Sequence, residues 1–311
     1  MIRFVTDQAE CEALWEQFSP RERVWDEWEL MYAFHDEARY HLNFMVHDTD
    51  DVIDGLIPLV EDTKDSSYEL FGGCYADSRI LWINIADFRE CFDALPDNTA
   101  FFDLRGTWVD SVLAQYPEYA PNFVEKDSQY YLVPADMDFD FSNHMLKTFS
   151  KDKRKNIERD LRKMVEARQP VLTWDDADET EAFIALNVKN FGEESDYAIE
   201  EGKQEVRRVV RELKDLGYLK TLTIRIDGVI QGVSLSALYN NHWVALYSSS
   251  NNDINNLGKY LTIETIQEGC RLKVDEINYM TGMAWKAAWH MNENPCRTMR
   301  KPAKPEADTP V

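Results

Sequence analysis

Two short segments, Val52-Ile53-Asp54-Gly55 and Val229-Ile230-Gln231-Gly232, decide the fold that this 311-residue sequence predicts. Each follows acidic or Asp-Gly turn residues and opens an apolar run that is typical of the returning strand of a hairpin. Repeats in solenoids recur every 20–50 residues or so. A match between positions 52 and 229 therefore indicates two copies of one domain.

The segments that flank these two strands follow the same order in both halves. Helices come first, then a strand, the turn, the returning strand, a third strand, a polar loop and another helix. In the first half, helical spacing covers 6–41 with a break at Ser19-Pro20, and in the second half it covers 180–191 and 203–216. Gly258 then opens a helix over 259–270.

We therefore expect an α/β fold of two units, each with a mixed central sheet flanked by helices. The last residues are rich in proline and poor in apolar side chains, which favours disorder. The expected parts are an N-terminal unit (1–135), a basic helical connector (136–170), a C-terminal unit (171–292) and a disordered tail (293–311).

The composition indicates the redox compartment of the protein and limits the classes of partner that it can bind. The five cysteines form no CxxC pair, as is typical of a reducing compartment. No apolar stretch reaches the roughly 18 residues of a spanning helix, and the N-terminus lacks the apolar core of a signal peptide. We expect a cytoplasmic protein that has no membrane segment. The net charge of −23 disfavours nucleic-acid binding by the surface as a whole and suits a cationic substrate, although it also simply favours solubility.

One basic segment stands out against this acidic background. Residues 147–168 contain nine Lys or Arg and four acidic residues. Lys151, Lys153, Arg154 and Lys155 could hold the phosphate of coenzyme A or of a tRNA acceptor end. A solvated linker helix would show the same run of charge.

Several motifs occur in an order that points to a family. Residues 55–60 read GLIPLV, residues 71–77 read FGGCYAD, Arg154 and Asn156 lie in the basic segment, and residues 257–286 end in Trp285-Lys286. Together, over about residues 20–290, they resemble the GNAT-like acyltransferases of the CelD type, which are related in fold to the Fem-type aminoacyl transferases. The resemblance implies tandem GNAT-like units, with two central strands splayed apart to admit a thioester arm.

The resemblance also implies a donor site in the second unit. A helix N-terminus presents unbonded N–H groups that suit a pyrophosphate, and glycine lets a ligand approach closely. A loop-to-helix junction would also favour glycine here. The residues predicted to bind acyl-CoA are Asn256, Leu257, Gly258, Lys259, Tyr260 and Arg154.

Four residues are candidates for catalysis. Lys286 follows an aromatic residue and could touch a phosphate or a polarised carbonyl. Transfer to an amine also needs a base for the ammonium proton, and Asp77, Glu264 and Asp275 stay open for this role. We expect no metal, because no His/Cys/Asp cluster has ligand spacing, and no catalytic-triad signature is present.

The predicted function is acyl transfer from acyl-CoA to a small or peptide amine. Two alternatives stay open. The first is Fem-type transfer from aminoacyl-tRNA, which the basic segment favours and the net charge opposes. The second is a non-catalytic GNAT-like binding protein. The second is motivated by departures from the family pattern: residues 255–260 keep only the central glycine of the phosphate loop, Asn278 replaces a usual aspartate, and Trp285 replaces a usual tyrosine.

Overall fold

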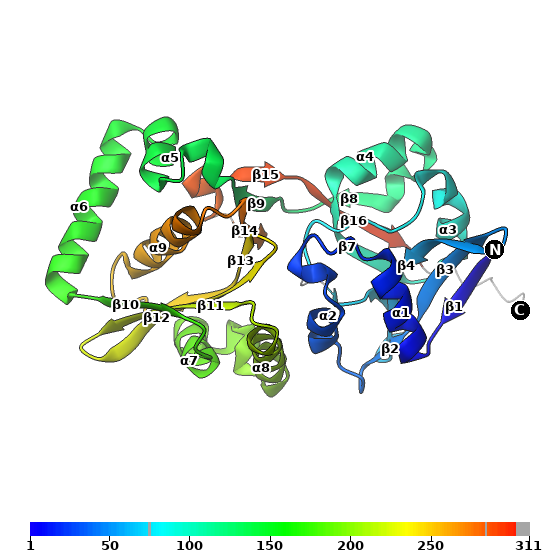
Figure 1. Cartoon of the computed structure of the whole chain (residues 1–311), viewed down its shortest axis with the longest axis horizontal. Helices are drawn as coiled ribbons and strands as arrows, with labels where there is room; N and C mark the ends of the chain where they lie inside the picture. The colour runs from blue at the N-terminus through cyan, green and yellow to red at the C-terminus, as the bar shows by residue number, and fades with distance from the viewer. Residues whose placement is uncertain (74–75, 284, 303–311) are drawn as a thin grey trace, which may run out of the picture.

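A computed structural model of the chain describes residues 1–73, 76–283 and 285–302. The chain forms two lobes that lie side by side and are joined by extended segments (Figure 1). Both lobes are α/β, with strands of mixed direction. Among the described residues, no helix is both long enough and apolar enough to cross a membrane.

Among the described residues, the first lobe holds two sheets and four α-helices. The first helix shows why the sequence folds locally as it does, because Asp7 accepts a hydrogen bond from the Glu10 amide and the next buried residues, Cys11, Leu14 and Trp15, share one helix face. The helices are α1 (Gln8–Phe18), α2 (Trp28–Phe34), α3 (Phe88–Ala94) and α4 (Gly106–Gln115). One sheet has the order β1 (Ile2–Val5), β3 (Phe44–Thr49), β4 (Val52–Ile57). The other has the order β2 (Tyr40–Leu42), β5 (Leu59–Asp62), β6 (Ser67–Leu70), β7 (Thr99–Arg105), β16 (Cys296–Lys301), β8 (Phe123–Glu125).

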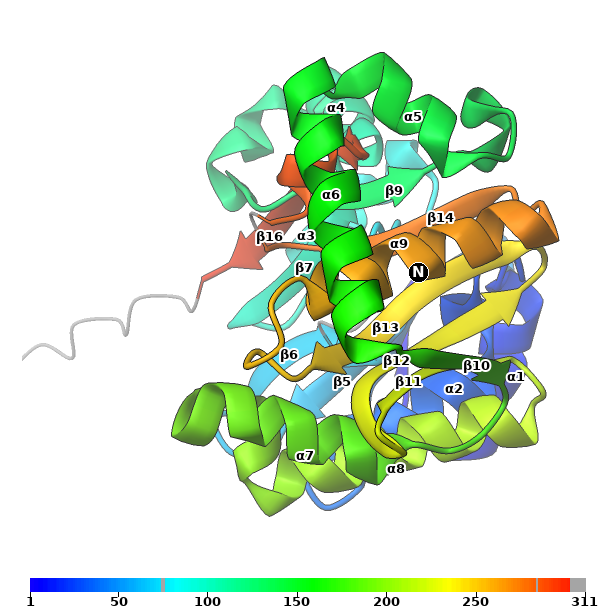
Figure 2. The same ribbon diagram turned by 90° about the vertical axis from the view of Figure 1, so that its left-hand side faces the viewer.

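The second lobe is a single seven-stranded sheet covered on both faces. Its order is β10 (Val171–Asp175), β11 (Leu219–Ile226), β12 (Val229–Tyr239), β13 (His242–Ser250), β14 (Glu276–Thr281), β9 (Gln129–Leu132), β15 (Asn292–Asn294). One face carries α7 (Thr180–Phe191) and α8 (Glu200–Asp215). The other carries α9 (Leu257–Leu272), with α5 (Phe141–Thr148) and α6 (Lys151–Arg168) outside it. Figure 2 shows α6 crossing α9.

The repeated hairpin is present in both lobes with the same irregularity. Each turn has two residues of positive φ, Asp50-Asp51 in the first lobe and Asp227-Gly228 in the second, as the favoured two-residue hairpin turns require. In both returning strands the pairing register skips one residue, and that residue is the third of the repeated segment, Asp54 or Gln231. The two hairpins therefore share a turn and a bulge as well as a sequence pattern.

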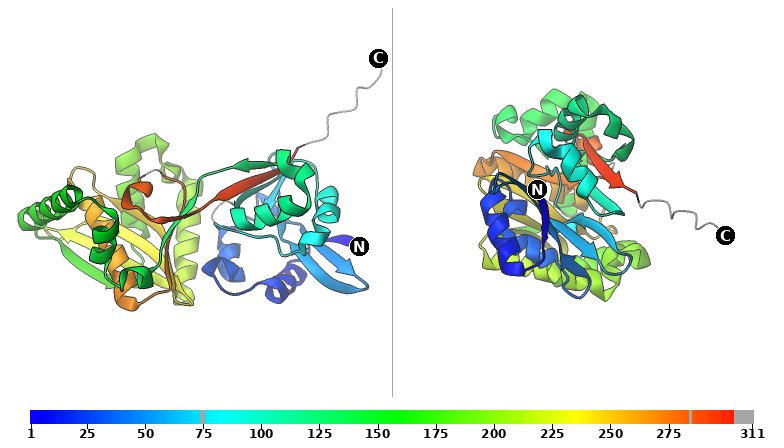
Figure 3. Two further views of the ribbon diagram at one scale, coloured as in Figure 1. Left: turned by 90° about the horizontal axis from the view of Figure 1, so that it is seen from above. Right: turned by 90° about the vertical axis from the view of Figure 1, so that its right-hand side faces the viewer.

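The two lobes exchange strands, which the sequence did not predict. β9 precedes residue 136 but pairs in the second sheet, between β14 and β15. β16 follows residue 293 but inserts between β7 and β8 of the first lobe. Figure 3 shows the two segments crossing between the lobes. The expected disordered tail is therefore wrong for residues 293–301, and the sheets do not divide at 135; residues 303–311 of that tail lie outside the described residues.

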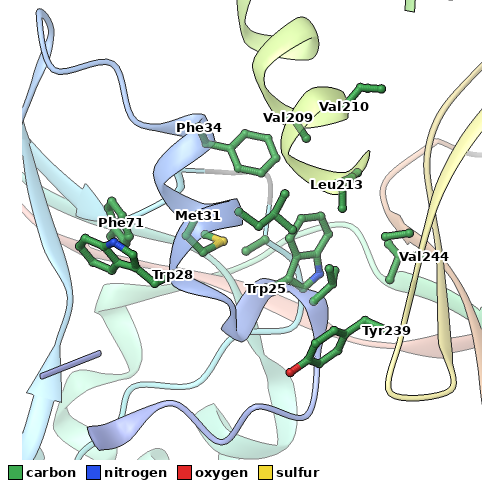
Figure 4. Close-up of a cluster of buried hydrophobic side chains, with 14 of the residues drawn as sticks. Trp25, Trp28, Met31, Phe34, Phe71, Val209, Val210, Leu213, Tyr239 and Val244 are labelled. Atoms are coloured by element: carbon green, nitrogen blue, oxygen red, sulfur yellow. The ribbon is translucent and has the colours of Figure 1, made fainter. Parts of the chain in front are cut away.

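An apolar cluster joins the two lobes (Figure 4). Trp25 and α2 of the first lobe meet α8 and the β12 and β13 strands of the second. Full burial of one large apolar side chain contributes about 1.5–3 kcal/mol to the free energy of unfolding, so this cluster stabilises the contact between the lobes. A bidentate ion pair between Arg23 and Glu276 borders the same interface. The labelled members of the cluster are Trp25, Trp28, Met31, Phe34, Phe71, Val209, Val210, Leu213, Tyr239 and Val244.

Candidate functional site

The central feature of the second lobe is a gap between two parallel strands. β13 and β14 pair only at His242, Trp243 and Val244 of β13, opposite Glu276, Ile277 and Asn278 of β14. Beyond Val244 the strands part, although β13 continues to Ser250. The register of β13 against β12 also shifts at this point, so that Leu246 is unpaired between Ala245 and Tyr247. The splayed strands that the resemblance implies are therefore present.

Asn278 shapes the strand on the far side of this gap. Its side-chain oxygen accepts a 2.6 Å hydrogen bond from the Met280 amide, and Met280 has a φ of +63°. Met283 also has a positive φ, and such conformations cost non-glycine residues about 1–2 kcal/mol. The pairing of β14 with β9 is irregular between Asn278 and Thr281. The side-chain hydrogen bond from the Met280 amide to Asn278 thus supports a strained backbone path that carries the end of β14 away from β13.

A cavity of about 840 Å³ opens at the carboxyl end of β13. Its walls come from α6, α7, β13, the start of α9 and the segment after β14. The lining combines aromatic and apolar side chains with serine and asparagine, and its charged members are Lys153, Asp160 and Lys259. Other lining residues are Asn156, Asn187, Asn190, Ser248, Ser249, Ser250, Gly258, Thr262, Met283 and Trp285.

One wall of the cavity suits a phosphate. Helix α9 begins at Leu257, and the amides of Gly258 and Lys259 have no hydrogen-bond partner among the described residues. Lys153 lies over the Phe149 ring at 4.5 Å and donates to the Ala288 carbonyl, but makes no ion pair with any described residue. Unbonded amides at a helix start beside an unneutralised ammonium attract an anion.

The structure brings only part of the predicted donor set to this cavity. Gly258 and Lys259 line it. Leu257 is fully buried in a core cluster, where Tyr260 also packs. Asn256 precedes the helix with a positive φ and accepts a hydrogen bond from the Lys259 ammonium. Arg154 donates to the Phe149 carbonyl at the end of α5, so it caps a helix instead of facing the cavity.

Asp77 and Lys286 lie close to the gap. Asp77 is 5% exposed and accepts hydrogen bonds from Trp25 (3.1 Å) and from Asn278 (3.3 Å) through Oδ1. Its other oxygen, Oδ2, is buried and accepts no hydrogen bond within the part of the chain that the structure describes. Burial raises the pKa of Asp77 to about 6, although neighbouring polar side chains, that of Gln129 among them, oppose this rise. A carboxyl group with this pKa can accept a proton near neutral pH.

Lys286 supports the strained end of β14. Its ammonium donates to the carbonyls of Thr281 (2.9 Å) and Met280 (3.3 Å). Burial lowers its pKa to about 8, while the negative charge of Asp77 acts in the opposite direction. The predicted residues Asp77 and Lys286 are thus brought together from different lobes.

The other two candidate acids lie elsewhere. Glu264 is on α9, outside the lining of the cavity, and burial raises its pKa while a hydrogen bond from Tyr260 lowers it. Asp275 is exposed at the amino end of β14, where its amide bonds to the Asn241 carbonyl. Because β13 and β14 are parallel, that end is opposite to the cavity. Neither residue is near the gap.

Sequence reasoning missed several residues of this region. Asn278 stood out only as a departure from a family pattern, whereas it bonds both Met280 and Asp77. The polar sequence from residue 248 predicts the start of the loop after the third strand, but residues 248–250 end β13 and line the cavity. Their signal was a run of small polar residues directly after an apolar strand.

The geometry agrees with comparisons to known proteins. Residues 151–287, which include Lys153, Gly258 and Lys286, match the family model described as an acetyltransferase (GNAT) domain. No curated protein matches the sequence. Asp77 lies outside the matched range.

Similar solved structures cover nearly the whole chain. A conserved protein of unknown function from Bacteroides thetaiotaomicron has a TM-score of 0.60 at 14% identity, over 96% of this chain and 99% of its own. FemX has a TM-score of 0.57 at 10% identity, over 96% of both chains. A tandem GNAT protein from the clavulanic acid biosynthesis pathway has a TM-score of 0.57 at 9% identity, over 98% of this chain and 100% of its own. The chain therefore has the Fem-related tandem GNAT fold, and its residues 151–287 match the GNAT domain model.

Proposed function

We propose that this protein transfers an acyl group from an acyl-CoA thioester to an amine. The observation that carries the proposal is the gap between β13 and β14, with the 840 Å³ cavity at one side and the buried carboxyl group of Asp77 at the other. The GNAT match over the same strands and helix supports it.

The donor would lie in the cavity with its phosphates at the start of α9. The amides of Gly258 and Lys259 and the ammonium of Lys153 supply donors and positive charge for this group. The apolar and aromatic part of the lining, which includes Trp285, suits the remainder of the molecule.

The acceptor amine would attack the thioester carbon from the Asp77 side. Asp77 accepts one proton of the ammonium group, and the amine nitrogen then forms the C–N bond as the C–S bond breaks. A second proton of that nitrogen passes to the departing thiolate, so coenzyme A leaves as the thiol. A pKa of about 6 leaves this carboxyl group mostly ionised at neutral pH, so it can accept the proton. Lys286 contributes by holding the end of β14 open.

Coenzyme A itself tests the donor site. A ligand that binds only the folded state stabilises it by about 2.7 kcal/mol at a hundred times its Kd, so we expect a clear rise in the melting temperature. Lys153→Ala should reduce this rise and lower the affinity about tenfold, since a charge-assisted hydrogen bond contributes about 1.5–3 kcal/mol. Lys163→Ala is the matched control, because Lys163 is exposed on the same helix outside the cavity.

The absence of any melting shift at millimolar coenzyme A would count decisively against the proposal. Release of free thiol from acetyl-CoA in the presence of an amine would exclude a purely non-catalytic binding protein.

Transfer from aminoacyl-tRNA is a second candidate because of one surface. Lys151, Lys155, Arg159 and Arg162 are exposed on α6 at spacings that place them on one helix face. Such a stripe can neutralise phosphates, and each neutralised phosphate steepens the salt dependence of binding. Salt-sensitive tRNA binding that is lost in a Lys155→Glu, Arg159→Glu, Arg162→Glu variant would favour this candidate. If the donor is acyl-CoA, the same variant should retain turnover.

A further inference from the structure

A second, smaller cavity lies in the first lobe, beside Asp77. Its volume is about 210 Å³, below the range of about 300–1,000 Å³ that is usual for drug-sized ligands. Trp15, Trp25, Trp82 and Phe71 form much of its wall. It therefore suits a small molecule with an apolar or aromatic body.

Asp77 connects this cavity with the reaction centre. Asp77 is among the residues that line the cavity, and its Oδ1 accepts a hydrogen bond from Asn278, the last residue of β14 that pairs with β13. Oδ2 accepts no hydrogen bond from any described residue, so it is a buried acceptor that an ammonium group of a ligand would satisfy. A ligand amine bound there would lie at the beginning of the gap.

Besides Asp77, the charged residues that line this cavity are Glu22, Asp26, Arg23, Arg79 and Arg105. Asp26 accepts hydrogen bonds from two backbone amides, and Arg79 donates to the Phe71 carbonyl. Arg105 supplies a positive charge for a ligand. It is half-buried, its Nε donates to the Ser78 hydroxyl at 3.2 Å, and it has no ion pair with any described residue. Arg23, which also lines the cavity, is already paired with Glu276. A partly buried guanidinium group with N–H donors to spare favours a carboxylate, which it can bind through two hydrogen bonds.

We propose that this cavity binds the acceptor, and that the acceptor is a small amino-carboxylate such as a free amino acid with an apolar side chain. The carboxylate lies on Arg105, the amine points toward Asp77, and the tryptophans enclose the side chain. Asp77 and Arg105 share the cavity without forming an ion pair with each other, so both charges are available to a zwitterion.

The transfer step in this inference rests on the proposed function. The amine nitrogen of the zwitterion forms an amide with the acyl carbon, the C–S bond of the thioester breaks, and one proton is released through Asp77. The products are an N-acyl amino acid and coenzyme A. Binding of the amino acid, in contrast, requires only the first lobe's cavity.

Calorimetric titration without coenzyme A tests the binding directly. We expect L-phenylalanine or L-leucine to bind, and phenethylamine and isoamylamine, which lack the carboxylate, to bind at least tenfold more weakly. Arg105→Gln should weaken amino-acid binding about 10- to 100-fold, as expected for loss of a charge-assisted contact. Arg105→Lys keeps the charge and should have a smaller effect. Arg211→Gln, which removes an exposed arginine from α8, is the matched control.

Equal binding of amines with and without a carboxylate would overturn the inference, as would an unchanged Kd in a folded Arg105→Gln variant. If Arg105→Gln does not fold, two comparisons still test the inference: the Kd of the Arg105→Lys variant, and the Kd of each amino acid against the matching amine without a carboxylate. The two proposals fail separately. Thiol release from acetyl-CoA with simple amines but without amino-acid binding would remove only this inference, whereas amino-acid binding without any coenzyme A effect would remove only the acyl-CoA donor.

Discussion

Asp77 has one carboxylate oxygen that accepts two hydrogen bonds and another that is buried and accepts none from the described residues. Its pKa of about 6 lies above the ordinary value of 3.8, so the folded protein holds this proton more tightly than the unfolded chain. Ionisation of Asp77 therefore opposes folding. Its contribution decreases stability as the pH rises from about 4 to 6, by up to roughly 3 kcal/mol. A buried carboxyl group that costs stability at neutral pH is typical of a functional site.

The substitution Asp77→Asn distinguishes the effect of Asp77 on stability from its proposed role in catalysis. The asparagine oxygen can still accept from Trp25 and Asn278, so we expect the melting temperature at pH 7 to be equal or higher. Turnover should fall on the order of 100- to 10,000-fold, because the proton acceptor is gone. In the unmodified protein, the rate should decrease as the pH falls below about 6, since Asp77 must be ionised to act.

A pH–rate profile and a thermal melt of both proteins check this prediction. Glu264→Gln is the control, because Glu264 lies outside the gap and its loss should leave turnover intact. An Asp77→Asn enzyme that turns over normally, with an unchanged pH profile, would remove Asp77 from the mechanism.

At the start of helix α9, one residue affects both the stability of the folded protein and the proposed binding of coenzyme A. Gly258 lies in the first turn of α9 without a positive φ, and a Cβ atom there would be 3.1 Å from the Ser250 hydroxyl, which can rotate. Alanine is favoured over glycine in a helix by about 0.5–1 kcal/mol. A glycine at this position is therefore explained better by the close approach of a ligand than by the helix itself.

Gly258→Ala is thus expected to keep or raise the melting temperature without ligand. The same methyl group would stand in front of the unbonded amides, so the rise in melting temperature caused by coenzyme A should shrink and the affinity should fall at least tenfold. Differential scanning fluorimetry across a coenzyme A titration measures both effects. A variant that is stabilised and still binds coenzyme A normally would show that the phosphates lie elsewhere.

The sequence predicted the start of α9 and the two repeated hairpins better than it predicted the side chains that shape the gap between β13 and β14. The start of α9 could be located from Gly258, and the repeated hairpins from their turn residues, because both signals are local. The role of Asn278 depends on Met280 in its own strand and on Asp77 in the other lobe. The second contact spans the two lobes, so no local pattern could reveal it.

At the scale of the whole molecule, the exchange of β9 and β16 ties the two lobes together, because each lobe contributes a strand to the other lobe's sheet. Composition misled here, because residues 293–301 contain few apolar side chains and read as disordered. Cys296 and Met299 nevertheless bury their side chains, and backbone pairing with β7 and β8 on both sides satisfies the strand. Such pairing joins residues about 200 positions apart, a distance that periodicity does not report. The position of Asp77 beside β14 depends on this arrangement.

Met299 and Arg300 provide a test of that arrangement from adjacent positions. Met299 is fully buried in the first lobe's core, whereas Arg300 is exposed. If β16 is an internal strand, Met299→Ala should destabilise the protein by about 2–5 kcal/mol, and Arg300→Ala should change stability by less than about 0.5 kcal/mol. Urea unfolding followed by tryptophan fluorescence measures both changes in stability, since several tryptophans lie in the first lobe.

Because the first lobe carries Asp77 and the Arg105 cavity, Met299→Ala should also weaken amino-acid binding near its unfolding midpoint. Equal and negligible effects of the two substitutions would mean that residues 296–301 are not part of the core.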